Sequence, residues 1–414
     1  MKILFILNQL PYPPRSGVTI PSYNYIRGLA ARNEVSLLYL RDPAHEAGEK
    51  DIENRALVRE LWVTVVTKLP AGDCIARELP GNYFFHIGRR YDREFIESIF
   101  KKNEFDAVWI SDDGIPDVAD VVRDYSGTRA PIVAAINDCI TEVFKQSITQ
   151  VFLKSGSIRE KIGLFIKWLR SLRAGPIENA ILSKFDKILV QSDSDRKALE
   201  KISDHTLDEN ILVLSNGVER ELFAASNDLD GKNLVFVGSL RGYSRIVELL
   251  LEDVWPAVKS AHPEAIFHVV GRGASPALRE KMARQQDVRH VEFVDDVVDI
   301  YRGKAVSISP VFKNYGLINK VIESMAAGVP VVADRGSFGC IPEFIDGRHG
   351  MVANDAQAMI SAIDGLLCSG KKRRQIAAEA RELVRKHFDW NDRIETIQSE
   401  LRNELARREQ PGGV

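Results

Sequence analysis

Residues 308–343 carry the pattern that leaves the fewest choices of fold. An apolar run that ends at Pro310 is typical of a buried strand, and Gly316 and Gly328 mark the two ends of a helical segment. The apolar run that begins at Pro330 predicts a second strand. The order strand, loop, helix, strand indicates an α/β architecture.

The start of this helix is a candidate phosphate site. A helix that begins near Leu317 leaves the amides of Gly316, Leu317 and Ile318 without partners inside the helix. The positive end of the helix dipole lies at the same place, and such ends bind phosphate groups.

Three polar residues follow on the helix. Asn319 and Glu323 are four residues apart and share one face, with Lys320 beside them. A carboxylate and a cation can therefore both approach a ligand seated over the helix start, as a ribose diol beside a diphosphate would be. The alternative to a ligand site is an ordinary amphipathic core helix bounded by glycine and proline. That alternative does not explain why three polar residues share one face.

The segment resembles the donor-binding segment of GT-B glycosyltransferases, above all of family 4. The family pattern is Glu-x7-Glu followed by Ala-Met-Ala-x-Gly-x-Pro-Val-Val, and 323–332 read Glu-Ser-Met-Ala-Ala-Gly-Val-Pro-Val-Val. Eight residues before Glu323 stands Tyr315, where the family usually has the Glu that contacts the donor sugar. Residues 316–323 are similar to the Gly-x-x-Asn-Lys-x-x-Glu of a subgroup of bacterial exopolysaccharide-type sugar transferases. The resemblance implies that Tyr315 and Asn319 belong to the reacting centre.

The length of the chain predicts two domains. A chain of 414 residues exceeds one compact core of usual size, and two domains of roughly 200 residues are expected. We expect a Rossmann-like acceptor-side domain over 1–218, a Rossmann-like nucleotide-sugar domain over 219–390, and a last helix, 391–414, that packs back on the first domain as in the family.

Charge and cysteine content exclude several classes of protein. With 56 basic and 58 acidic residues, the net charge of -2 gives no support for a nucleic-acid partner. The four cysteines are widely spaced, so neither a disulfide framework nor a cysteine zinc site is indicated. The first ten residues lack the features of a signal peptide, and no stretch has transmembrane length. We therefore expect a cytoplasmic protein, attached to a membrane at most peripherally.

Strand and helix signals alternate through the first half, which predicts a parallel sheet with sites at the carboxyl ends of its strands. The loop 9–17 leaves the first strand there, and in the family the corresponding loop carries glycines near the donor phosphates. In this chain the loop has one such glycine, Gly17, which is the candidate for a contact with the donor phosphates. The alternative is that the loop is a surface loop stiffened by its prolines and has no part in binding. Asp138 follows a later strand where the family places a side chain near the reacting centre, although a helix cap would explain it equally well.

The second half repeats the pattern, and two arginines follow its first strand. A loop is expected to hold Arg241 and Arg245 before a helix that begins near Ile246. In the family a cation at this point pairs with the donor diphosphate, and a guanidinium suits a phosphate because it can donate two parallel hydrogen bonds. The Gly-Arg-Gly turn at 271–273 lacks the third glycine of a dinucleotide fingerprint, which argues against NAD.

A basic amphipathic run covers 152–173. Such a helix could rest on an anionic bilayer or cover an acceptor cleft, but it could equally pack on its own domain. Membrane contact stays one possibility for this segment.

The resemblance implies transfer of a sugar from a nucleotide-diphosphate sugar to an acceptor, retaining and without a metal or other cofactor. Two Asp-x-Asp sequences, 193–195 and 228–230, are expected at a helix cap and a turn rather than at a metal. A sugar-nucleotide epimerase of the same fold would need no acceptor. A sugar-binding protein with two domains would normally carry an export signal.

Overall fold

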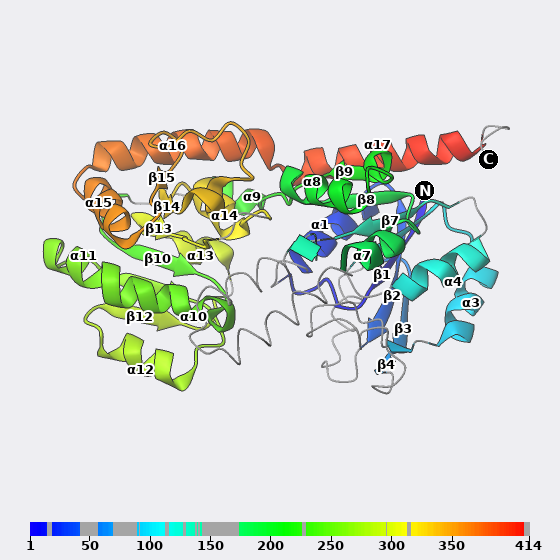
Figure 1. Cartoon of the computed structure of the whole chain (residues 1–414), viewed down its shortest axis with the longest axis horizontal. Coiled ribbons are helices and arrows are strands. Elements are labelled where there is room, and N and C mark those ends of the chain that lie inside the picture. Colours follow the sequence, from blue (N-terminus) through cyan, green and yellow to red (C-terminus); the bar gives the residue numbers. More distant parts are fainter. Residues whose placement is uncertain are drawn as a thin grey trace. The chain divides into compact units, whose positions relative to one another are not determined.

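The structure of the chain is a computed structural model (Figure 1). It describes residues 1–14, 19–41, 57–68, 89–90, 92–111, 116–126, 130–136, 139, 141–142, 174–225, 229–294, 296–312 and 316–409. The chain divides into two compact units: unit 1 is Met1–Ser215 with Asn391–Val414, and unit 2 is Asn216–Trp390.

Unit 1 contains a seven-stranded sheet whose strand pairs are all parallel. The strand order is β3-β2-β1-β6-β7-β8-β9, so the order reverses between β1 and β6. The strands are β1 (Lys2–Leu7), β2 (Glu34–Arg41), β3 (Leu61–Val65), β6 (Ala107–Ser111), β7 (Ile132–Ala135), β8 (Lys187–Val190) and β9 (Ile211–Val213), and a separate pair is β4 (Thr67–Lys68) and β5 (Arg89–Arg90). The helices are α1 (Thr19–Ala30), α3 (Arg93–Lys102), α4 (Pro116–Ser126), α7 (Ala174–Leu182), α8 (Asp193–Ile202), the 3₁₀ turn η2 (Asp208–Asn210) and α17 (Trp390–Glu409).

Helix α17 completes unit 1 although it lies at the far end of the sequence. Ile394 of α17 meets Gly28 of α1 so closely that a Cβ at position 28 would lie 2.0 Å from the Ile394 Cδ1 atom. Arg393 donates from Nε to the Ser215 carbonyl at 3.2 Å. The glycine thus permits a close approach that fixes the last helix to the first.

Unit 2 has a six-stranded parallel sheet of order β12-β11-β10-β13-β14-β15. Its strands are β10 (Leu234–Val237), β11 (Phe267–Val270), β12 (Val288–Val291), β13 (Val306–Ile308), β14 (Val331–Ala333) and β15 (Met351–Val352). Its helices are α9 (Arg220–Ala224), α10 (Leu240–Leu249), the π segment η3 (Leu250–Val254), α11 (Trp255–Ala261), α12 (Pro276–Arg284), α13 (Val297–Tyr301), α14 (Asn319–Ala326), the 3₁₀ turn η4 (Arg335–Phe338), α15 (Ala356–Leu367) and α16 (Gly370–His387).

The sheet of unit 2 is buried on both faces. Leu234 and Phe236 of β10 belong to one apolar cluster, while Val235 between them belongs to another on the opposite face. The period of two along a strand produces this alternation, and a sheet buried on both sides reads as a continuous apolar run. The strand order reverses between β10 and β13, which is where open parallel sheets bind ligands beyond the carboxyl ends of their strands.

Candidate active site

Helix α14 lies next to this reversal point and begins at Asn319, two residues later than the sequence predicts. Ile318 is the N-cap and has extended backbone angles, with no side chain bonded to the helix start. Gly316 has φ +73°, a turn conformation that suits glycine, and its carbonyl accepts from the Cys340 thiol at 3.2 Å. Gly316, Leu317 and Ile318 therefore form the turn before the helix, whereas the sequence predicts a helix that begins near Leu317.

Glu323 lies one turn into α14 and receives a hydrogen bond from a buried phenol. The Tyr301 hydroxyl donates to Glu323 Oε2 at 3.3 Å, and the Tyr301 ring is fully buried. Glu323 keeps some contact with solvent. Burial nevertheless raises the pKa of its carboxyl to about 7, with the negative charge of Glu219 adding to this and the Tyr301 bond and Lys320 opposing it.

Lys320 is a buried cation on two aromatic rings. The residue is 8% exposed, and Nζ lies 3.6 Å from the centre of the Tyr243 ring and 4.7 Å from that of Phe236. A ring face attracts a cation through its quadrupole, so the rings hold the ammonium group in place. A Cβ at Gly238 would lie 3.1 Å from Nζ, which puts the charge at the carboxyl end of β10.

Asn319 is fixed by a residue from the beginning of unit 2. Asn216 donates from Nδ2 to Asn319 Oδ1 at 3.2 Å, and Asn216 is buried. Asn216 is a site residue that the sequence motifs do not predict. Its Ser-Asn-Gly-Val setting is the one local signal that could have indicated the contact.

Arg241 and Arg245 both lie on α10, so the prediction of a loop around them is wrong. The amide of Leu240 donates to the Arg272 carbonyl at 2.8 Å, and this contact from the neighbouring strand end starts the helix early. Arg241 lies against the turn at Gly273, where a Cβ would be 3.2 Å from the Arg241 Cβ. Arg245 is 89% exposed and pairs with Glu248 at 3.3 Å. Of the two, Arg241 is the one beside the strand ends.

Several expected site residues fall outside the described residues. These are Gly17, Asp138, Tyr315 and the whole basic run 152–173. In the part of the chain that the structure describes, the first Asp-x-Asp sequence forms the opening turn of α8. Ser192 is the N-cap of that helix, and its hydroxyl accepts from the Asp195 amide.

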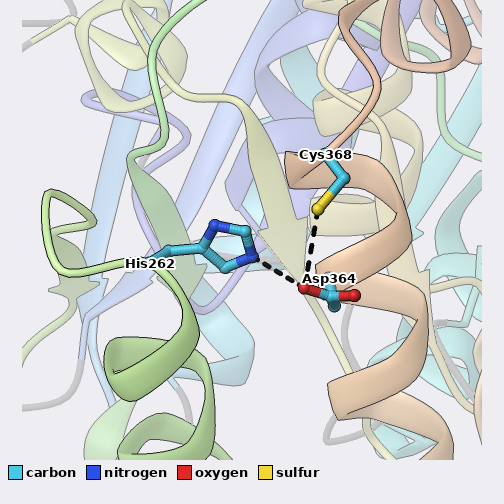
Figure 2. A group of neighbouring side chains, drawn as sticks. All are labelled: His262, Asp364 and Cys368. Atoms are coloured by element: carbon cyan, nitrogen blue, oxygen red, sulfur yellow. Dashed lines mark hydrogen bonds and ion pairs between the residues drawn. The ribbon is translucent and has the colours of Figure 1, made fainter.

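A group of possible metal ligands lies where the end of α11 meets the last turn of α15 (Figure 2). Among the described residues, His262, Asp364 and Cys368 bring their ligand atoms within 4.8 Å of one another. Lys232 Nζ lies 3.2 Å from His262 Nδ1, and His262 Nε2 lies 2.9 Å from Asp364 Oδ1.

The polarity of these contacts opposes a metal ion. An ammonium group can only donate, so His262 Nδ1 accepts and Nε2 carries the proton that it donates to Asp364. A histidine that binds a metal instead presents a bare nitrogen to the ion and donates its other N–H to an acceptor. Lys232 occupies the place of that acceptor, so the arrangement fits a hydrogen-bonded chain better than a metal centre.

The two units together have the GT-B fold. HepE from Anabaena, solved with UDP and glucose, is 17% identical with a TM-score of 0.67, covering 97% of this chain and 100% of that chain. Sucrose-phosphate synthase from Thermosynechococcus elongatus is 17% identical with a TM-score of 0.67 over 98% and 99%. TarM from S. aureus, solved with fondaparinux, alpha-GlcNAc-glycerol and UDP, is 13% identical with a TM-score of 0.67 over 98% and 99%. At these identities the likeness concerns the fold.

The match to a known protein family lies within unit 2. Residues 231–369 match the family described as Glycosyl transferases group 1. No curated protein matches the chain by sequence. The matched region contains β10 to α15, and so includes Tyr301, Lys320 and Glu323.

None of the described helices combines the length and the apolar character that crossing a bilayer requires.

Proposed function

We propose that this protein is a glycosyltransferase that moves a sugar from a nucleotide-diphosphate sugar to an acceptor. The observation that carries the proposal is the pairing of a carboxylate, Glu323, with a buried cation, Lys320, on α14 beside the strand-order reversal of unit 2. The match of 231–369 to Glycosyl transferases group 1 supports it. So do the UDP-bound structures of HepE and TarM, which share the fold.

In the proposed complex, Glu323 accepts hydrogen bonds from the ribose hydroxyls of the donor. Lys320, Arg241 and the amides at the start of α14 face the diphosphate. A cation and a helix start stabilise the negative charge that grows on the leaving diphosphate, because they are fixed before the reaction begins. Arg245 has a more distant role, since it is paired with Glu248 and only Arg241 lies against the turn at Gly273.

The reaction exchanges one bond at the sugar for another. The bond between the anomeric carbon and the diphosphate oxygen breaks, and a bond from that carbon to the acceptor hydroxyl oxygen forms. The acceptor proton passes to the departing phosphate, so the products are a glycoside and a nucleoside diphosphate. We propose a retaining, metal-independent reaction of the family 4 type, with Asn319, Tyr315 and Asp138 at the reacting centre and Gly17 near the donor phosphates.

The wider assignment is part of the same proposal. The acceptor is a glycan, a lipid-linked sugar or a small molecule, and the exopolysaccharide-type transferases are the proposed subgroup. We also propose that the work is divided between an acceptor-side domain, 1–218, and a donor domain, 219–390. A cytoplasmic location with peripheral membrane contact through 152–173 completes the proposal.

Binding of nucleoside diphosphates to Glu323 variants tests the donor site. Hydrogen bonds to a charged group contribute about 1.5 to 3 kcal/mol, so Glu323→Ala should weaken binding by roughly 10- to 100-fold in titration calorimetry. Glu252 on η3 is exposed and pairs with Lys281 at 2.6 Å, so Glu252→Ala removes the same type of carboxylate outside α14 and serves as the control. Equal affinity of the parent protein and Glu323→Ala would refute the assignment of the site.

Incubation with nucleotide sugars tests the reaction class. Release of nucleoside diphosphate that increases when acceptor sugars are added supports transfer. Formation of an epimer of the donor sugar without any acceptor would instead identify the epimerase alternative.

A further inference from the structure

Three basic side chains of unit 2 lie close enough for their charges to interact. His268 lies on β11, Arg289 is its direct partner in the register of β12, and Lys304 precedes β13. All three lie in the first half of a strand or before one, so the cluster is nearer the amino ends of the strands. The candidate donor site lies at their carboxyl ends.

The cluster is buried to different depths. Lys304 is 9% exposed, His268 is half-buried and Arg289 is exposed on the edge strand of the sheet. The Lys304 ammonium donates to the Arg302 carbonyl at 3.1 Å, which satisfies one of its three hydrogens. The positive charge of the group is therefore partly withdrawn from water.

Neighbouring acidic residues are engaged with other cations. Asp287 pairs with Lys259 at 2.5 Å, Glu292 with Arg279 at 2.7 Å and Asp299 with Arg302 at 2.6 Å. Within the described ranges, none of the three side chains of the cluster takes part in an ion pair. Burying charge without a counter-charge is unfavourable, so the cluster is incomplete as it stands.

The three groups repel one another, and burial adds to the effect on their pKa values. Burial, then Lys304 and then Arg289, lower the pKa of His268 to about 4. Burial and Arg289 also lower the pKa of Lys304. An anion placed among them would reverse both effects, because an opposite charge favours the protonated forms.

We propose that His268, Arg289 and Lys304 form a second anion site, which binds a phosphate group. A phosphate dianion suits two permanent cations and one inducible cation better than a carboxylate does, since it offers more charge and more acceptor oxygens. Arg289 can contribute two parallel hydrogen bonds. A soluble phosphorylated compound and the headgroup of an anionic lipid would present the same chemistry. The site does not depend on the proposed transferase activity.

Histidine NMR tests the site directly on the full chain. The His268 signal is assigned as the one missing from His268→Gln, and inorganic phosphate is titrated at constant ionic strength kept with sodium chloride. We expect the signal to move in a saturable way and the pKa of His268 to rise. Absence of a saturable change, or the same change with chloride, would overturn the proposal.

Variants separate this site from the donor site. Lys304→Met and Arg289→Gln should each weaken phosphate binding by at least about tenfold, which is the effect of losing a charged hydrogen bond. Lys304→Met should remain folded and melt at a higher temperature in phosphate-free buffer, because an uncompensated buried charge is removed. Lys320→Met should leave the response of His268 unchanged. Loss of the response in Lys320→Met would place the anion at α14 and refute the second site.

Vesicles identify the source of the phosphate. Co-sedimentation with vesicles of phosphatidic acid in phosphatidylcholine, lost in Lys304→Met, would support a lipid headgroup as the ligand. Phosphate binding without sedimentation would support a soluble phosphorylated compound. Both outcomes require the saturable phosphate response described above.

Discussion

Tyr301 and Glu323 share a hydrogen bond of 3.3 Å in which the phenol is the donor. Burial raises the pKa of Tyr301 well above its usual value, with the charge of Glu323 adding to the effect, so the phenol keeps its proton. The protonated phenol can therefore donate to Glu323 from inside the protein, with the Lys320 carbonyl at 3.5 Å as its other acceptor. The remaining acceptor capacity of Glu323 is available to a ligand.

The stability of the protein should depend on the charge of Glu323. Its pKa is about 7 in the folded chain against about 4.3 when unfolded, so the folded state binds the proton more tightly. The contribution of this carboxyl to the free energy of unfolding should thus fall as pH rises from about 4.3 to about 7. Above about pH 7 this contribution should change no further. Glu323→Gln should remove this slope and gain at most about 4 kcal/mol at pH 8.

Urea unfolding of the parent and Glu323→Gln across this pH range measures the difference. The gain should shrink steadily towards acid pH. A difference that does not vary with pH would mean that the carboxyl titrates normally.

The rings under Lys320 should matter for diphosphate binding. Tyr243→Phe keeps a ring face below the ammonium and should preserve affinity, whereas Tyr243→Leu removes it. Cation–π contacts are worth about 0.5 to 2 kcal/mol, so Tyr243→Leu should weaken binding of a nucleoside diphosphate by up to roughly 30-fold. Binding of the parent nucleoside, which has no phosphate, should be the same in both variants.

Calorimetric titration with the two ligands separates the explanations. Equal losses for nucleoside and diphosphate in Tyr243→Leu would point to general distortion of the site instead of a displaced cation.

A larger side chain at position 217 should destabilise the protein, because Trp390 fills the space beside Gly217. A Cβ at position 217 would lie 2.6 Å from two atoms of the indole ring. Gly217→Ala should therefore destabilise unit 2 by about 1 to 3 kcal/mol, as overpacking does. Gly365→Ala is the control: nothing lies within 4 Å of its Cβ position on α15, and the change should be neutral or stabilising by up to about 1 kcal/mol.

The measurement is the unfolding midpoint of Gly217→Ala, of the control Gly365→Ala, of Trp390→Leu, and of the double variant Gly217→Ala with Trp390→Leu. The double variant should lose less stability than the two single changes added together, since they relieve one contact. Additive losses would mean that the indole does not limit position 217.

Lys232 should control metal binding at His262. Lys232→Gln replaces a donor by a side chain that can accept from Nδ1–H, which frees Nε2 for an ion. Zinc affinity should rise by roughly 10- to 100-fold, the size of effect usual for partners of metal-binding histidines. Competition with a chromophoric chelator measures it, and Cys368→Ser in the same background should reduce the gain. Unchanged zinc affinity in Lys232→Gln would show that the polarity of the contact is not the obstacle.

The fold class could be predicted from the sequence, and the structure confirms it. Short apolar runs such as Leu234–Val237 and the glycines around α14 are local signals, and they suffice for parallel sheets. The start of α10 could not be predicted in this way. Gly242 and Ser244 make its first turns resemble a loop, and the helix begins there because Leu240 is buried and its amide bonds to Arg272, far along the chain.

The candidate site was only partly predictable for the same reason. Lys320 and Glu323 stand out because they are polar residues on an apolar helix. The rings that hold Lys320, the phenol that bonds Glu323 and the amide of Asn216 come from other elements. Asn216 and Asn319 are 103 residues apart, and the Ser-Asn-Gly-Val sequence around Asn216 does not by itself identify Asn319 as its partner.

Unit 2 is one uninterrupted stretch of chain, whereas unit 1 needs α17 from beyond it. In topological terms, unit 2 is an insertion into unit 1. Its two ends meet, because the Val218 amide donates to the Phe388 carbonyl at 2.8 Å. A single cassette, 216–390, could therefore be exchanged for that of a relative without cutting unit 1 at any further point. If the donor is recognised by unit 2, such a graft would change the sugar transferred and leave the acceptor the same.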